Sequence, residues 1–213
     1  MQHNFDELNI NSTSGQKQRI SSYREYFAPM DLPESELEDR IALAEELEPI
    51  FIWLFLLIVG GMYSKYTMQT MLQERLTLTI RGFFSITFLN TYLQSYVEKI
   101  SEEVIRVTLE NQEDDYYTSV NRAQYIAANE TNVLANYREQ IEAVNNGFQY
   151  KIWITENDSR VRHTHKEVHN TKIDILKPFI VGNSRLLFPK DFSMGASAEE
   201  TVNCRCHIQY TKF

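Results

Sequence analysis

The chain has 213 residues, of which 43% are hydrophobic and 23% are charged, with only 7 Gly and 5 Pro. This composition is typical of a globular protein and excludes collagen-like and disordered chains. The formal net charge of −8 argues against a protein that coats nucleic acid through its overall electrostatic field.

The charge is unevenly distributed along the chain. Residues 1–150 carry 11 Lys and Arg against 22 Asp and Glu, a net charge of −11, whereas residues 151–213 carry 10 against 7, a net charge of +3. An acidic front followed by a mildly basic tail indicates two parts with different partners.

Residues 1–20 are polar and contain the turn-forming run Ser-Thr-Ser-Gly, so we expect a poorly ordered arm. This arm lacks the apolar stretch of a secretory signal. Without export, the two cysteines of the chain, Cys204 and Cys206, are expected to stay reduced.

Residues 21–118 are predicted to form a mainly helical region that faces partner proteins. Pro33 followed by several acidic residues predicts a helix start, because proline is tolerated in the first turn and carboxylates favour the positive end of the helix dipole. The most hydrophobic stretch is Ile50–Tyr63, which is shorter than the about 20 residues of a membrane span. We expect a buried helix or an oligomer contact there, with a membrane-active segment as the alternative.

Two later segments repeat apolar residues at steps of three and four, which predicts amphipathic helices. The first covers residues 95–112, and the second covers residues 118–147 and should stop at Asn145-Asn146-Gly147.

After this point the period of the apolar residues changes to two. Residues 148–155 alternate and are rich in aromatic and β-branched side chains, which predicts a strand, and residues 185–188 and 204–210 are further strand candidates.

These patterns together predict an α+β protein. A long, mainly helical N-terminal region is expected to precede a small C-terminal α+β unit with a short sheet, from Phe148 onward.

An ordered series of short motifs runs through this last part of the chain. It comprises Ile126, Ala127 and Glu130 on the second helix, Trp153 in the strand, then Asp158, Arg160, Arg162 and His165, then Pro189 and Asp191, Gly195 and Ala196, and finally Asn203 to Cys206. In this order the motifs resemble those of the minor head proteins of tailed phages, the head-morphogenesis family typified by protein F of phage Mu. The resemblance covers roughly residues 120–210 and implies a minor head domain of this family over residues 119–213.

Two positions depart from the family pattern. Asn129 stands before Glu130, where the family commonly has Arg. Asn170 stands where the family often has Gly, and asparagine can still adopt a positive φ.

The resemblance implies a structural protein of the virion that needs no catalytic step. It would act at the portal during head assembly and in DNA packaging, retention or ejection, in the host cytoplasm while heads assemble and then inside the head. Its partners would be the portal protein, other capsid proteins and phage DNA. The alternatives are an enzyme (a hydrolase, a nuclease or a toxin-like protein) that uses the His/Arg/Cys cluster, and a membrane-active ejection protein built on Ile50–Tyr63.

Cys204 and Cys206 admit several interpretations. A disulfide is disfavoured, because side chains two apart on a strand lie about 6.6 Å from each other. One structural zinc could be held by both thiolates together with His165 and His169, which share a face if they lie on a helix. A catalytic thiol would need a neighbouring base. The preferred interpretation is that both cysteines pack in the core.

The remaining motif residues are candidates for a charged network or for phosphate contacts: Glu130, Asp158, Arg160, Arg162, Asp191, Asn203 and Arg205. Guanidinium groups suit DNA phosphates or an acidic partner surface. The preferred interpretation is a network in which the acidic residues Asp158, Glu130 and Asp191 pair with the arginines and tie the helix to the strands, because buried charges need partners.

Overall fold

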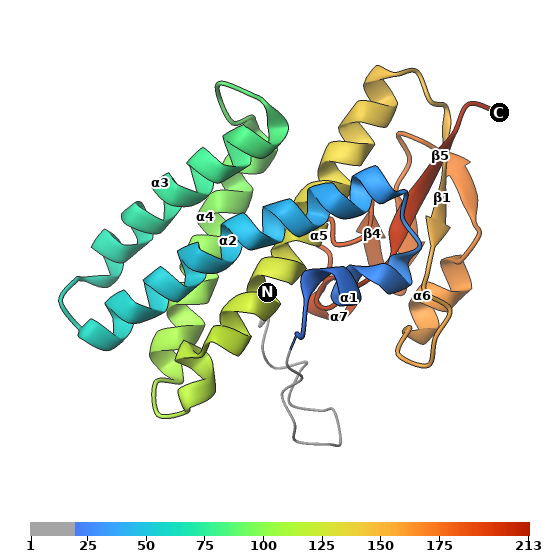
Figure 1. Ribbon diagram of the computed structural model, residues 1–213. Coiled ribbons are helices and arrows are strands. Elements are labelled where there is room, and N and C mark those ends of the chain that lie inside the picture. Colours follow the sequence, from blue (N-terminus) through green and yellow to red (C-terminus); the bar gives the residue numbers. More distant parts are fainter. Residues whose placement is uncertain (1–19) are drawn as a thin grey trace. The chain divides into compact units, whose positions relative to one another are not determined.

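The computed structural model describes residues 20–213, which form two compact units (Figure 1). The helical unit consists of residues 20–26 and Glu38–Ala128, and the mixed unit consists of Phe27–Leu37 and Asn129–Phe213. Two long helices, α2 (Glu34–Gly60) and α5 (Val120–Asn145), contribute residues to both units.

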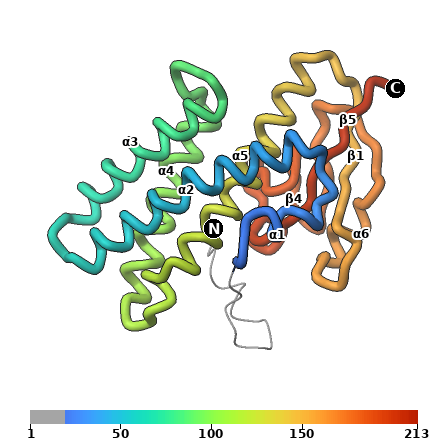
Figure 2. Tube along the Cα trace, viewed as in Figure 1, coloured from blue at the N-terminus to red at the C-terminus, as the bar shows by residue number. Residues whose placement is uncertain are grey.

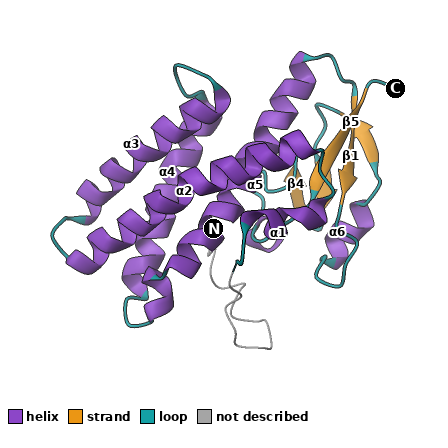
Figure 3. Ribbon diagram, in the orientation of Figure 1, coloured by secondary structure: helices purple, strands orange, loops and turns teal. Residues whose placement is uncertain are grey.

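The described part of the helical unit contains helices and no strands (Figure 3). It holds most of α1 (Tyr23–Phe27), residues 38–60 of α2, α3 (Lys65–Phe84), α4 (Thr91–Glu110), the 3-10 turn η3 (Asp115–Thr118) and residues 120–128 of α5. The helix predicted over residues 95–112 is α4. Asn90 caps its start by accepting a hydrogen bond of 3.0 Å from the Leu93 amide.

Helix α2 begins directly after Pro33, as predicted, and the Pro33 carbonyl accepts hydrogen bonds of 3.0 Å from two amides of the first turn. The helix ends at Gly60, and Gly61 has a φ of +62°. Its apolar C-terminal half is only partly covered. Phe51, Leu54, Phe55 and Ile58 are buried, whereas Leu56 and Val59 are two-thirds exposed. Within residues 20–213, no helix has the length and apolar character that crossing a membrane requires.

Arg122 is a fully buried cation in the helical unit that the sequence analysis did not single out. Its Nη1 donates hydrogen bonds of 2.7 Å to Thr108 Oγ1 and to the Tyr117 carbonyl. The guanidinium carbon lies 5.0 Å from the centre of the Phe55 ring and 5.1 Å from that of Tyr117. The charge is therefore buried among hydrogen-bond acceptors and aromatic faces, which compensate for lost water.

The mixed unit contains a three-stranded antiparallel sheet in the order β2-β1-β5. Its strands are β1 (Tyr150–Ile154), β2 (Lys172–Asp174) and β5 (His207–Thr211), and the chain trace of Figure 2 shows the C-terminal β5 beside β1. A second sheet pairs β3 (Phe179–Val181) with β4 (Ser184–Leu186). The short helices α6 (His163–Val168) and α7 (Ala198–Thr201) and the 3-10 turn η2 (Ala28–Met30) complete the unit.

The predicted strand over residues 148–155 is confirmed as β1, whereas the predicted strand over residues 204–210 begins only at His207. The ladder stops there because Ile154, the last residue of β1, pairs with His207. The next amide, that of Thr155, donates to His169 Nδ1 at 3.1 Å. Likewise, the strand predicted over residues 185–188 ends at Leu186, because the Leu187 amide donates to Asp191 Oδ2 at 2.9 Å.

The core of the mixed unit surrounds Trp153, which is fully buried as expected. The Phe179 ring packs edge-on against it at 5.2 Å between ring centres. Residues 129–137 of α5 are buried without interruption. The helix ends at Asn145, and Gly147 has a φ of +72°, so the predicted stop is confirmed.

The α+β class is confirmed, with helices in the N-terminal part and a small sheet near the C-terminus. The two compact units divide within α5, between Ala128 and Asn129. The boundaries expected at residues 20 and 118 stay predictions, and residues 1–19 lie outside the described part of the chain.

Lys151 on β1 is also fully buried, and its Nζ donates a hydrogen bond of 2.6 Å to the Leu187 carbonyl. Burial lowers the pKa of this ammonium group to about 8, although the charges of Asp191 and Asp174 oppose the shift.

We expect Arg122→Ala to lower the free energy of unfolding by about 3 kcal/mol, because the substitution removes the donor for two buried acceptors and opens a cavity. Urea denaturation of the full chain measures the loss. Arg106→Ala is the matched control. Arg106 pairs with Glu103 at 2.7 Å on the surface of α4, and such partly exposed ion pairs contribute about 0.5 kcal/mol. Equal losses for the two variants would contradict the assignment.

Lys151→Met is expected to change how stability depends on pH. The pKa of Lys151 in the folded chain is about 8, below its unfolded value, so the unfolded chain binds more protons between pH 8 and about 10. The free energy of unfolding of the wild type should therefore rise over this interval, by about 2 kcal/mol relative to the variant. Chemical denaturation of both proteins at pH 7 and pH 10 tests this. If their free energies of unfolding differ by the same amount at both pH values, the prediction is wrong.

Candidate functional site

The motif residues His165, Cys204 and Cys206 meet in one buried cluster of the mixed unit, centred on His165. Helix α6 supplies His165, helix α7 supplies Glu200, and the loop between α7 and β5 supplies Cys204 and Cys206. All four side chains are buried, with exposed fractions between 1% and 7%.

Both ring nitrogens of His165 have partners. Nδ1 lies 3.4 Å from Cys206 Sγ and 3.5 Å from Cys204 Sγ, and Nε2 lies 3.0 Å from Glu200 Oε2. The ring also packs edge-on against Trp153 at 5.6 Å between centres. Helix α6 is thereby joined through one imidazole to β1, to α7 and to the loop that follows α7.

Both thiols are free, and the two sulfur atoms lie within 4.8 Å of each other and of His165 Nδ1. Burial by itself would raise the pKa of Cys204. Hydrogen bonds from Cys206 and His165, with the charges of His165 and Lys190, instead hold this pKa well below its usual range. The hydrogen bond to Cys204, burial and the charge of Cys204 raise the pKa of Cys206 well above its usual range. One thiol is thus the preferred site of negative charge.

The pKa of His165 is raised. Burial would lower it, but the hydrogen bond and charge of Cys204 and the charge of Glu200 outweigh that effect. The charges around the ring therefore favour the protonated, cationic imidazole more than water does.

His169, expected beside His165, does not join the cluster. Helix α6 ends at Val168, so the helical spacing that would have placed both rings on one face is not continued. The Nδ1 atom of His169 instead accepts the Thr155 amide at 3.1 Å. The histidine pair expected from the sequence is thus a single histidine, and the second partner of its ring is Glu200, for which the sequence offered no spacing signal.

The position of Glu200 depends on two further residues. Thr164 Oγ1 donates a hydrogen bond of 2.8 Å to Glu200 Oε2. Gly182, with a φ of +56°, opens the two-residue turn between β3 and β4, and a Cβ atom there would lie 2.4 Å from Glu200 Oε1. The Gly-Asn pair in this turn was a readable hairpin signal.

The arginines of the motif surround Asp158. Arg205 Nη2 donates to Asp158 Oδ2 at 2.7 Å, and Arg160 lies 3.3 Å from the same oxygen. Although partial burial opposes it, the hydrogen bond from Arg205 helps to hold the pKa of Asp158 below its usual value. Arg162 instead donates to the Val202 carbonyl at the start of the cysteine loop. Asp158 therefore pairs with two arginines, whereas Asp191, for which an arginine partner was also expected, binds backbone amides.

The other motif residues bind backbone and amide groups. Asp191 accepts the amides of Leu187 and Ser193, both at 2.9 Å. Asn129 Nδ2 donates to Glu130 Oε1 at 2.6 Å. Asn129 Oδ1 accepts the Lys190 ammonium and, at 3.3 Å, the Asn203 amide.

The two positions that depart from the family pattern fit this structure. The Asn129 side chain joins α5 to two later segments, and burial lowers the pKa of its partner Lys190 to about 8. Asn170 has a φ of +60°, so it adopts the positive φ expected of it.

A small cavity with a volume of about 20 Å³ adjoins the cluster. Its lining includes Glu156, Arg162 and Asn203 together with His165 and the two cysteines. Burial raises the pKa of Glu156 to about 7. The cavity has room for one water molecule or ion but not for an organic substrate.

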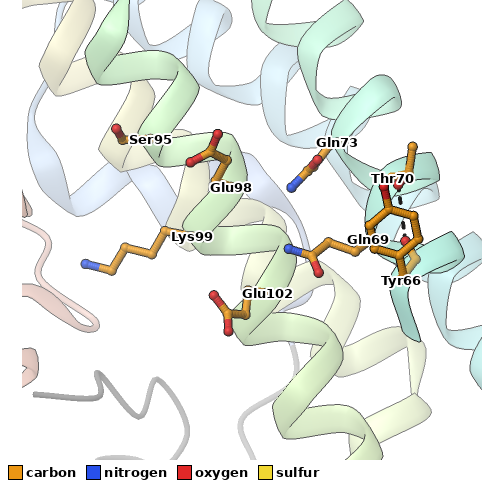
Figure 4. Close-up of a pocket in the computed structure, with 8 residues that line it drawn as sticks. All are labelled: Tyr66, Gln69, Thr70, Gln73, Ser95, Glu98, Lys99 and Glu102. Atoms are coloured by element: carbon orange, nitrogen blue, oxygen red, sulfur yellow. Dashed lines mark hydrogen bonds between the residues drawn. The ribbon is translucent and has the colours of Figure 1, made fainter. Parts of the chain in front are cut away.

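The helical unit carries a wider groove between α3 and α4 (Figure 4). Tyr66, Gln69, Thr70 and Gln73 line it from α3, and Ser95, Glu98, Lys99 and Glu102 line it from α4. These groups are amides, hydroxyls, carboxylates and one ammonium group on two helices. They offer hydrogen bonds to a polar partner surface but no thiol or imidazole nucleophile.

We expect Gly182→Ala to destabilise the chain more than Gly195→Ala. Both positions have positive φ, so both substitutions cost about 1 kcal/mol of backbone strain. Only at position 182 must the new methyl group displace Glu200, breaking its bonds to His165 and Thr164, which should add about 1–2 kcal/mol. Chemical denaturation of the two variants compares these losses. Equal losses would show that Glu200 does not stabilise the cluster.

The chain matches the family described as Phage Mu protein F like protein over residues 87–209, more than half of its length. The match therefore begins well before residue 120, where the resemblance was expected to start, and it includes all of α4. No curated protein and no solved structure matches the chain. The extent of the family match, with the motif residues His165, Cys204 and Cys206 gathered in one buried cluster, shows that the chain belongs to the phage Mu protein F-like family of phage head proteins.

Proposed function

We propose that this chain is a minor head protein that binds the portal during head assembly and serves in the packaging, retention or ejection of DNA. Membership in a family of structural head proteins supports a role through binding rather than catalysis. In this proposal the chain works in the host cytoplasm while heads assemble and remains inside the finished head.

An exposed apolar surface on the helical unit is the observation that supports protein partners. It consists of Leu56, Val59, Met62, Tyr63 and Tyr66, at the end of α2, in the following turn and at the start of α3. We call it the apolar corner. Its side chains are between 42% and 79% exposed. Clustered exposed apolar side chains commonly mark sites of protein association.

The charge of the helical region favours a protein partner over DNA. Residues 1–150, which include the whole helical unit, have a net charge of −11. Phosphate groups would be repelled there. In the mixed unit, Arg160 and Arg205 already pair with Asp158, which occupies two of the candidate phosphate contacts. DNA is therefore the secondary partner in this proposal.

An enzymatic function would rest on the Cys204 and His165 pair, a thiol beside a base. Cys204 is only 2% exposed, and the adjoining cavity has a volume of only about 20 Å³. A nucleophile must reach its substrate, so burial favours a structural role for this pair.

Leu56→Glu combined with Val59→Glu is expected to abolish incorporation into heads without unfolding the chain. Both side chains are about two-thirds exposed in α2, so carboxylates there stay hydrated in the free protein but would be desolvated in an apolar interface. The measurements are co-purification with the portal protein of the same phage and complementation of a phage that lacks the gene. We expect the titre to fall by about a hundredfold or more.

Leu176→Glu is the matched control, because this leucine is equally exposed, at 69%, but lies in the mixed unit. It should leave portal binding and titre unchanged. Normal portal binding and titre for the double variant, with circular dichroism like that of the wild type, would rule out the apolar corner as the portal-binding surface.

A further inference from the structure

The two sulfur atoms of Cys204 and Cys206 converge on a single nitrogen atom, Nδ1 of His165, at 3.5 and 3.4 Å. An imidazole nitrogen has one lone pair in the ring plane, so it can accept only one S–H hydrogen bond. A single S–H hydrogen bond therefore accounts for only one of the two nearly equal sulfur–nitrogen distances. They are the distances expected if all three atoms bind one cation.

The distances fit a tetrahedral zinc ion. With Zn–S bonds of about 2.3 Å and Zn–N bonds of about 2.0–2.1 Å, a tetrahedron places nitrogen and sulfur about 3.6 Å apart and two sulfurs about 3.8 Å apart. The observed nitrogen–sulfur distances lie close to this value, and all three atoms lie within 4.8 Å of one another. Among the described residues, this is the one group of three His, Cys, Asp or Glu side chains close enough to share an ion.

The other face of the imidazole is arranged as a metal ligand requires. Nε2 faces Glu200 Oε2 at 3.0 Å, which keeps the proton on Nε2 and leaves the Nδ1 lone pair free for a cation. Glu200 is itself held by Thr164 at 2.8 Å and has space only because residue 182 is glycine. A carboxylate that orients a histidine in this way is the usual support of a zinc-bound imidazole.

The fourth position of such a tetrahedron would face the small cavity beside the cluster. Glu156 lines this cavity, and its Oε1 is buried and has no hydrogen-bond partner among the described residues. A buried carboxylate oxygen without a donor is costly, and a cation or a cation-bound water would satisfy it. Two thiolates and one divalent ion also cancel in charge, which suits a buried site.

We propose that Cys204 Sγ, Cys206 Sγ and His165 Nδ1 bind one structural zinc ion, with Glu200 orienting the histidine and the fourth position filled by Glu156 or water. Thiolate and imidazole ligands in a tetrahedral arrangement favour zinc over magnesium and calcium, which prefer oxygen. The ion would join the closing loop to α6. This site goes beyond the proposed role at the portal and does not depend on it.

The metal content of the full-length chain, purified in reducing buffer without chelator, tests the proposal. We expect inductively coupled plasma mass spectrometry to find about one zinc ion per chain. Cobalt(II) added to the chelator-treated protein should give the ligand-field bands of a tetrahedral site and a thiolate-to-cobalt charge-transfer band. Chelator should lower the melting temperature by about 5 °C or more.

Variants identify the ligands. Cys204→Ser, Cys206→Ser and His165→Asn should each lose the zinc and the cobalt bands, and Glu200→Gln should weaken zinc binding about 10- to 100-fold. His169→Asn is the matched control, because that histidine lies outside the cluster, and it should keep the metal.

The wild-type protein alone can overturn the proposal, so a variant that fails to fold does not leave it untested. Less than about a tenth of an equivalent of zinc, no cobalt bands and a melting temperature indifferent to chelator would show that the cysteines only pack in the core. Zinc that survives in the folded His165→Asn and Cys204→Ser variants, or that is lost in His169→Asn, would refute the assigned ligands.

Discussion

The mixed unit depends on the buried imidazole of His165 more than on any other single group. A buried histidine must satisfy two ring nitrogens, and each of these finds its partner on a different segment. The sulfurs of Cys204 and Cys206 bring in the closing loop, Glu200 brings in α7, and the ring face rests against Trp153 of β1. These contacts join α6 to the closing loop, to α7 and to β1, so the cluster links the segments of a small core.

The same principle explains why the family motifs are short, polar and widely spaced. A unit with only short strands gains little from sheet hydrogen bonds, and side chains take over part of that task. Asp191 binds two backbone amides, and Asn129 joins α5 to Lys190 and Asn203. These motif residues describe how the unit is held together. Exposed apolar side chains such as Leu56 and Val59, which we propose as a partner surface, are not part of the motifs.

Local patterns predicted the local structure well. The apolar periodicity gave α4 and α5, alternation gave β1, and asparagine and glycine marked turns with positive φ. The errors fell where a distant side chain competes for a backbone group. The strand predicted from Cys204 begins late because Thr155 binds His169, and the strand near Leu187 ends early because Asp191 binds its amide.

By itself the sequence determined the helix and strand types, the ordered motif of the family and four candidate ligands, three of which form the thiol–imidazole cluster. Period, capping and turn preferences act over a few residues, so they can be read from neighbouring positions. Only the tertiary structure decided that His169 stays outside the cluster, that Glu200 enters it, and that Arg122 and Lys151 are buried as cations. Burial and pairing of polar groups depend on which segments meet in space, and no spacing along the chain encodes that.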